Sequence, residues 1–125
     1  MSSHEIKLRK AKLILEEYFG DSIENLLFQP KLSRIKIQLR NDNILFIQYN
    51  DYNEYSYSII FSEIQLDRCR FDNYDNRWDV PTRPHHFHPR YKKEAIRSNM
   101  NGEPDNDIPY FCELIKTGKI INLSG

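Results

Sequence analysis

Three of the four histidines in this 125-residue chain fall within four positions, as His85, His86 and His88. Imidazole titrates near neutral pH, so it can both accept and donate a proton under cellular conditions. In an extended segment, His86 and His88 point to one face and His85 points to the other. Two imidazoles that project together into solvent could cleave RNA without a metal, one deprotonating the 2′-hydroxyl and the other protonating the leaving oxygen.

The same histidines allow two other interpretations. They could be metal ligands together with a carboxylate such as Asp72 or Asp79, because imidazole and carboxylate both bind transition metals. They could also form a polar sheet edge, or pack against backbone carbonyls, because a local histidine cluster is weak evidence for a site. The residues alone leave these alternatives open.

A second group of residues suits a phosphate and the bases beside it. The planar guanidinium of arginine matches phosphate oxygens and can stabilise charge that develops on phosphorus. Aromatic rings between the charges could stack on unpaired bases, although a single such residue is more often a solvated charge or part of the core. The group comprises Arg68, Arg70, Asp72, Asn73, Tyr74, Arg77, Trp78, Arg83, Phe87 and Arg90.

Composition narrows the class of protein. Eighteen basic residues balance eighteen acidic ones, so net charge gives no long-range attraction to nucleic acid, although a local basic patch is compatible with it. Cys69 and Cys112 lack CxxC spacing, which indicates buried thiols in a reducing compartment. The N-terminus has no apolar signal-peptide region, and no apolar run approaches the ~18 residues of a membrane span. We therefore expect a soluble, cytoplasmic protein.

The helices and strands that must position these residues are expected to form a single α+β domain over residues 1–125, because a chain of this length usually folds as one domain. Apolar residues at steps of three and four predict a helix over about 3–19, capped by Ser3 and ended by Gly20. Residues 23–28 are ambiguous between a helical turn and a short strand. A final helix is predicted over about 107–117, with Asp105 or Asp107 as its cap and Pro109 in its first turn.

Alternation of apolar and polar residues predicts the sheet between these helices. Asn and Asp residues supply short turns, and short turns between consecutive strands require antiparallel neighbours. The fold class is therefore an antiparallel meander of about five strands with both helices packed on it. The predicted strands cover about 34–40, 43–50, 54–62, 64–71 and 85–88, and residues 92–103 are expected to be a loop.

Three segments of the chain resemble the TumE family of small toxins. They are Tyr55-Ser56-Tyr57, Arg70-Phe71-Asp72-Asn73 and Pro84-His85-His86-Phe87-His88, which match a YSYH-like strand, an R-[WYF]-D-N box and a P-H-H-x-H box. The resemblance covers about residues 44–88, and the order of the two helices agrees. The chain departs from the pattern at Ser58, where a histidine is common, and at 74–78, where many members carry a histidine pair.

This resemblance implies the toxin of a toxin–antitoxin module, whose cognate antitoxin binds DNA and whose proposed activity is RNA cleavage. We expect an endoribonuclease that needs no metal or other cofactor, with RNA and the antitoxin as partners, no membrane association, and homodimerisation left open. A non-catalytic partner-binding module, a degenerate toxin relative and a metal-dependent hydrolase are the alternatives.

Roles can be assigned to the candidate residues on this basis. His86 and His88 would exchange protons, Arg70 and Arg83 would hold phosphate, and Asp72 would orient an imidazole or an arginine. Tyr74 or Trp78 would stack on a base. The expected catalytic set is His85, His86, His88, Arg70 and Asp72, and the expected substrate-binding set is Arg68, Tyr74, Arg77, Trp78, Arg83 and Arg90.

Overall fold

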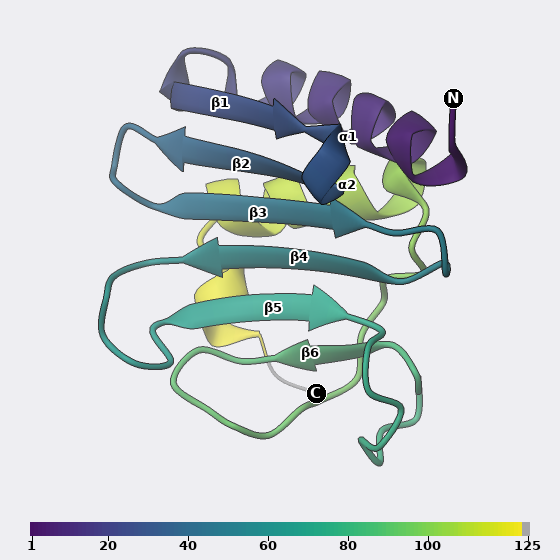
Figure 1. The fold of residues 1–125 in the computed structure, drawn as a ribbon. Helices are drawn as coiled ribbons and strands as arrows, with labels where there is room; N and C mark the ends of the chain where they lie inside the picture. The colour runs from purple at the N-terminus through teal and green to yellow at the C-terminus, as the bar shows by residue number, and fades with distance from the viewer. Residues whose placement is uncertain (124–125) are drawn as a thin grey trace.

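The computed structural model describes residues 1–123 and contains a six-stranded antiparallel sheet with a helix from each end of the chain (Figure 1). The strands neighbour one another in chain order, so the predicted α+β meander is confirmed, with six strands instead of about five. The elements are α1 (Ser3–Phe19), β1 (Ile23–Gln29), β2 (Arg34–Leu39), β3 (Ile44–Tyr49), β4 (Tyr55–Ile60), β5 (Arg68–Asp72), β6 (His86–His88) and α2 (Pro104–Lys116), with 3-10 turns η1 (Gly20–Ser22), η2 (Pro30–Leu32) and η3 (Lys119–Asn122).

The additional strand is β1, in the segment that the sequence leaves ambiguous. It pairs with β2 along its length, with Leu26 opposite Ile37 and Phe28 opposite Ile35. A register shift between Ile23 and Asn25 interrupts the alternation of faces. A bulged edge strand lacks a clean period of two, which explains why its sequence pattern is weak.

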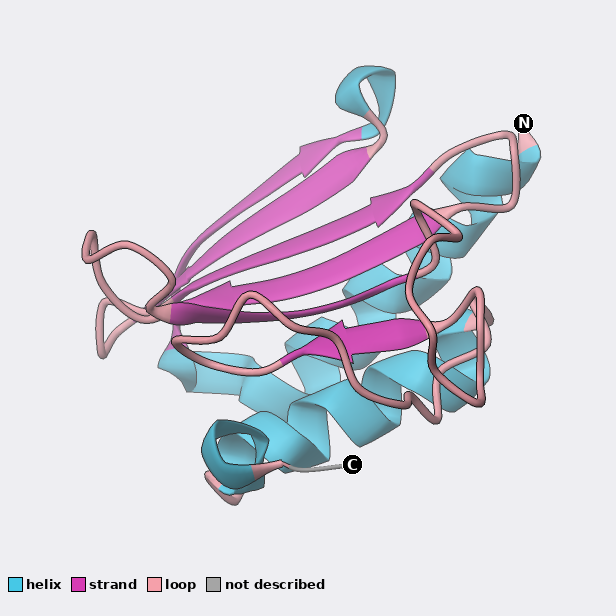
Figure 2. Cartoon of the chain, turned by 90° about the horizontal axis from the view of Figure 1, so that it is seen from below, coloured by secondary structure: helices cyan, strands magenta, loops and turns pink. Residues whose placement is uncertain are grey.

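Both helices cover the same face of the sheet, and the opposite face is open (Figure 2). Every second strand residue points toward the helices and joins one apolar core. Burial of such side chains contributes about 1.5–3 kcal/mol each. The core includes Leu8, Ala11 and Leu15 of α1, Ile35, Ile37, Leu45, Ile47, Tyr57, Ile59, Phe71 and Phe87 of the sheet, and Ile108, Phe111 and Cys112 of α2.

The fourth predicted strand begins later than expected. β5 starts at Arg68, whereas the pattern predicted a strand from about residue 64. Leu66 has a φ of 64°, a left-handed conformation that is incompatible with an extended strand. The preceding residues form a turn in which the Asp67 N–H donates to the Ile64 carbonyl at 3.0 Å.

Helix α2 begins before the predicted start, at Pro104, so Pro109 lies inside the helix and not in its first turn. Neither predicted aspartate is the cap, because Glu103 occupies that position. Asp107 is instead fully buried and accepts hydrogen bonds from the Gly102 N–H at 2.7 Å and the Tyr57 hydroxyl at 2.7 Å. This carboxylate ties the loop before α2 to the centre of the sheet. The N-terminal helix α1 is capped by Ser2 and not, as predicted, by Ser3.

The segment 92–103 is a loop, as expected, and it is attached to the sheet. Phe87 and Ile96 exchange two backbone hydrogen bonds, at 2.9 and 2.8 Å. This bridge holds the loop against the outer edge of β6, where its two lysines reach the site described below.

Both cysteines are free and buried. Burial raises the pKa of Cys69 to about 11 and the pKa of Cys112 to about 12. Both are therefore neutral thiols at physiological pH, which makes them poor nucleophiles.

Replacing Asp107 with alanine is predicted to destabilise the fold by about 2–4 kcal/mol, because it removes one partner of the Tyr57 hydroxyl and the acceptor of the backbone N–H groups of Asn101 and Gly102. Urea unfolding of the purified variant measures this. Asp105→Ala is the matched control, since Asp105 is an exposed residue in the same helix turn that pairs only with Lys10, at 3.5 Å. Equal stability of the two variants would contradict the anchoring role of Asp107.

Candidate active site

The pairing of β5 with β6 brings four predicted site residues together on the open face of the sheet. Arg70 lies opposite His88, and Asp72 lies opposite His86. The ring centroids of His86 and His88 are 4.8 Å apart and perpendicular, so the prediction that these two side chains share a face is confirmed. We call these four residues the quartet.

The buried carboxylate of Asp72 holds the quartet together. Its Oδ1 lies 2.7 Å from His86 Nε2 and accepts a hydrogen bond from the Tyr74 backbone N–H at 3.2 Å. Its Oδ2 lies 2.5 Å from Arg70 Nε. The Arg70 N–H is not aligned along a hydrogen bond, so this contact is mainly electrostatic. Asp72 therefore contacts an imidazole and an arginine at once.

His86 is engaged at both ring nitrogens. Its Nδ1 donates to the Pro84 carbonyl at 2.8 Å, and its Nε2 lies 2.7 Å from Asp72 Oδ1. The residue is 1% exposed. The expectation that both histidines project into solvent is therefore wrong for His86, because its neighbours on β5 and in the loop before β6 enclose the ring. A ring held in this way can orient Asp72 but has no nitrogen free for a substrate.

His88 lies in a different environment. It is only partly buried, yet its Nε2 is inaccessible and has no hydrogen-bond partner within residues 1–123. Burial and, to a smaller extent, the positive charge of Arg70 together lower the pKa of His88 to about 4. The ring is thus neutral at physiological pH. A neutral imidazole with an unpartnered nitrogen is a candidate proton acceptor.

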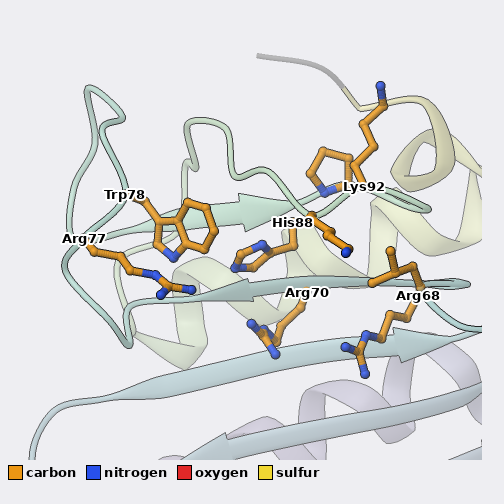
Figure 3. Close-up of a pocket in the computed structure, with 9 residues that line it drawn as sticks. Arg68, Arg70, Arg77, Trp78, His88 and Lys92 are labelled. Atoms are coloured by element: carbon orange, nitrogen blue, oxygen red, sulfur yellow. The ribbon is translucent and has the colours of Figure 1, made fainter.

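His88 forms one wall of a cavity of about 290 Å³ that is lined by positive side chains (Figure 3). Figure 3 shows Arg70, Arg77 and the Trp78 ring grouped around His88. Among the described residues none of the nine that line this cavity is acidic, so it favours an anionic ligand. We call it the cationic cavity; its positive residues are Arg68, Arg70, Arg77, Lys92 and Lys93.

A second cavity, of about 240 Å³, adjoins the first and extends over β4 toward β3. Three residues line both cavities: Arg70, Arg77 and Trp78. The Arg77 guanidinium lies 4.8 Å from the centre of the Trp78 ring. The Trp78 and His88 rings are nearly perpendicular, with their centroids 5.1 Å apart. The remaining lining residues of this second cavity are Gln48, Ser56, Asp72, Tyr74, Asp75 and His86.

Three predicted site residues lie outside both cavities and make other contacts. His85 stacks on Tyr55 and its Nδ1 lies 2.9 Å from the Tyr55 hydroxyl. The Arg83 guanidinium donates to Asn76, at 2.7 Å to its carbonyl. Arg90 Nε donates to Asp67 at 2.5 Å. The structure does not bring these three side chains to the quartet.

Asn73 has a positioning role. Its Oδ1 accepts from the Tyr55 N–H at 2.9 Å, and its Nδ2 donates to the Asn53 carbonyl at 2.9 Å. The R-F-D-N segment thus sends Arg70 and Asp72 to the open face, Phe71 to the core, and Asn73 to the β3–β4 turn.

Two residues of the cationic cavity were missed by sequence reasoning. Lys92 and Lys93 lie in the segment expected to be a loop, where two adjacent lysines resemble any solvated surface. The Phe87–Ile96 bridge and the hydrogen bond from the Tyr91 N–H to the Leu66 carbonyl, at 2.7 Å, bring that segment alongside the cavity. No local pattern signals this placement.

Asp72, His86 and His88 could also supply three metal-ligand atoms, which lie within 4.8 Å of one another. Two features disfavour a cation there. Asp72 and His86 already use the relevant atoms to bond to each other, and the adjoining cavity concentrates five positive side chains. The electrostatics of the site favour an anion.

Comparison with known proteins identifies the family. A family model described as Toxin TumE matches residues 10–117, which include the whole quartet and both cavities. The chain belongs to the TumE toxin family. Membership assigns it a toxin role, as the R-x-D-N and P-H-H-x-H boxes suggested. No curated protein and no solved structure matches the chain.

None of the helices within residues 1–123 combines the length and the apolar character needed to cross a membrane.

His88 is predicted to titrate near pH 4, and Arg70→Met is predicted to raise that midpoint by removing a neighbouring positive charge. Because the folded pKa lies below the usual value of 6.5, the unfolded chain takes up a proton first as pH falls. The contribution of His88 to stability is therefore complete above pH 6.5 and is lost progressively toward pH 4. NMR titration measures the midpoint, and a midpoint near 6.5 in the wild-type protein would contradict this electrostatic picture.

Proposed function

We propose that this TumE-family toxin is an endoribonuclease whose scissile phosphate binds in the cationic cavity beside His88. One observation carries the proposal: an unpartnered nitrogen of a neutral histidine borders a cavity with five positive and no acidic lining residues. An RNA phosphodiester supplies both features that such a site needs, an anion and an adjacent hydroxyl that can lose a proton.

In this proposal RNA that enters the cavity displaces the side chains covering His88 Nε2. This nitrogen then takes the proton from the 2′-hydroxyl, and the 2′-oxygen attacks phosphorus. The bond from phosphorus to the 5′-oxygen then breaks, and the protonated imidazole returns its proton to that oxygen. The products are a 2′,3′-cyclic phosphate and a 5′-hydroxyl. Arg70 and Arg77 stabilise the negative charge that develops on the phosphate oxygens. No metal or other cofactor enters this sequence.

His86 and Asp72, the remaining members of the quartet, position the reacting groups. His86 and Asp72 bond to each other and hold the Arg70 guanidinium beside His88, so they fix the geometry without contacting the reacting atoms. Trp78 borders both cavities and offers a face for base stacking. This assigns one proton-transferring histidine to the reaction, whereas sequence spacing suggested two.

The same proposal places the protein in the cytoplasm with RNA, and makes its cognate antitoxin the partner that blocks the cationic cavity. An antitoxin segment with acidic side chains would compete with phosphate for the same positive charges.

His88→Gln is predicted to lower RNA cleavage by about 10²–10⁴-fold, the usual contribution of a general base, and to relieve growth arrest on expression in a bacterial host. The measurement is cleavage of a labelled single-stranded RNA by purified protein, with and without chelator. Cleavage should be insensitive to chelator, and the products should carry 2′,3′-cyclic phosphate ends.

The matched control for this experiment is His4→Gln. His4 lies on α1, bonded to Asp51 at 2.7 Å and remote from the open face, so its loss should leave cleavage unchanged. Full toxicity of a folded His88→Gln protein would refute the proposed mechanism. Absence of RNA cleavage by the wild-type protein, together with stable capture of a protein partner, would favour the non-catalytic module. Loss of cleavage in chelator would favour the metal-dependent alternative.

A further inference from the structure

The open face of the sheet continues beyond the quartet in register. Arg70 lies opposite Ser58, Ser58 opposite Phe46, and Phe46 opposite Lys36, so one row of side chains runs across β5, β4, β3 and β2. Adjacent strands are about 4.8 Å apart, and the row from His88 to Lys36 therefore spans about 19 Å. The row beside it passes from Asp72 through Ser56 and Gln48 to Arg34.

Phe46 is an aromatic ring on the open face, flanked by positive charge. The Arg34 guanidinium lies 5.7 Å from the centre of the ring, and the Lys36 ammonium lies 5.8 Å from it. The residue is only partly buried, and it points away from the core that its neighbours Leu45 and Ile47 join. No core packing accounts for a phenylalanine at this position.

The surface between Phe46 and the quartet carries small side chains and is continuous with the site. Ser56 and Ser58 are the small open-face residues of β4, and the second cavity reaches from the quartet over Ser56 to Gln48 on β3. None of the open-face residues of β2, β3 and β4 is acidic. A chain of negative charges could therefore lie across this face with no like-charge repulsion from these strands.

We propose that the open face of β2–β4 binds the single-stranded RNA that flanks the cleaved phosphate, with Phe46 stacking on a base and Lys36 and Arg34 contacting phosphates. This inference rests on the proposed function and adds to it the class of substrate and a second binding region. Stacking on aromatic rings together with backbone contacts from positive side chains is how sheet surfaces hold unpaired strands.

The geometry selects a single strand over a duplex. A base must be unstacked to lie on Phe46, and the bases of a duplex are already stacked on each other and paired. Cleavage beside His88 also requires an unpaired strand, because in-line attack by the 2′-hydroxyl needs a flexible backbone at the cleaved bond. The proposed occupant is therefore an unpaired segment at least long enough to reach from β6 to β2.

The test measures binding apart from cleavage. A fluorescent single-stranded RNA is titrated with His88→Gln protein, alone and combined with Phe46→Ala or Lys36→Gln. Phe46→Ala should weaken binding by about 5- to 150-fold, the effect of losing one stacked base. Lys36→Gln should reduce the slope of log affinity against log salt by about 0.7, the effect of losing one phosphate contact on a single strand.

Matched variants on other surfaces give the controls. Tyr52→Ala removes an aromatic ring that is 83% exposed in the β3–β4 turn, and Lys12→Gln removes a positive charge from α1. Both should leave affinity and salt slope unchanged. Phe46→Leu keeps an apolar side chain and guards against misfolding of the alanine variant, and it should also weaken binding.

The outcomes separate this inference from the proposed function. If the single strand binds in a Phe46-dependent way while the wild-type protein cleaves no RNA, the nuclease proposal fails and the binding surface stands. If the wild-type protein cleaves RNA but Phe46→Leu and Lys36→Gln bind it as tightly as their parent, the surface proposal is overturned. Equal or tighter binding of a duplex of the same sequence would also overturn it.

Discussion

The alternation of side chains across the β5–β6 pair is the constraint on which the site depends. Phe71 and Phe87 face each other in the core with ring centroids 4.3 Å apart. Because side chains alternate along a strand, burial of these two rings sends the residues on either side to the open face. A slip of one residue would place four polar side chains under the helices, at a large desolvation cost. The hydrophobic core thus sets the register of the quartet.

Two histidines of the same short strand have different properties because their neighbours differ. His86 bonds to the Pro84 carbonyl through Nδ1, and its Nε2 lies 2.7 Å from the Asp72 carboxylate. His88 has Arg70 opposite it and, among residues 1–123, no hydrogen-bond partner at Nε2, so burial and repulsion favour its neutral form. Asp72 and Arg70 lie two residues apart on β5. Each faces a different histidine, and this difference gives His86 and His88 their different properties.

The balance of charge over the whole chain conceals its distribution in the fold. The net charge is zero, yet five positive side chains from three separate segments converge on one cavity, and further positive residues lie on the open face of β2. Coulomb interactions fall off over about 8 Å at physiological salt, so an approaching anion responds to the local cluster. A toxin of neutral net charge can therefore present a locally positive surface to an anion.

The sequence alone determines those features of the structure that depend only on residues close together in the chain. The period of α1, the alternation of β2, β3 and β4, and the shared face of His86 and His88 follow from helix and strand geometry within a few residues. The R-x-D-N and P-H-H-x-H boxes marked the family and the four residues of the quartet.

Tertiary structure alone decided which of the candidate residues meet. β1 became a strand because β2 offered it an edge, and the turn at Leu66 shortened β5 against its sequence pattern. Arg83 bonds to Asn76 and Arg90 bonds to Asp67. Lys92 and Lys93 reach the cationic cavity through backbone contacts of their neighbours Tyr91 and Ile96. Composition and spacing cannot reveal these placements, because they depend on contacts between residues far apart in the chain. The same reason applies to His86, whose enclosure arises from a partner on another strand.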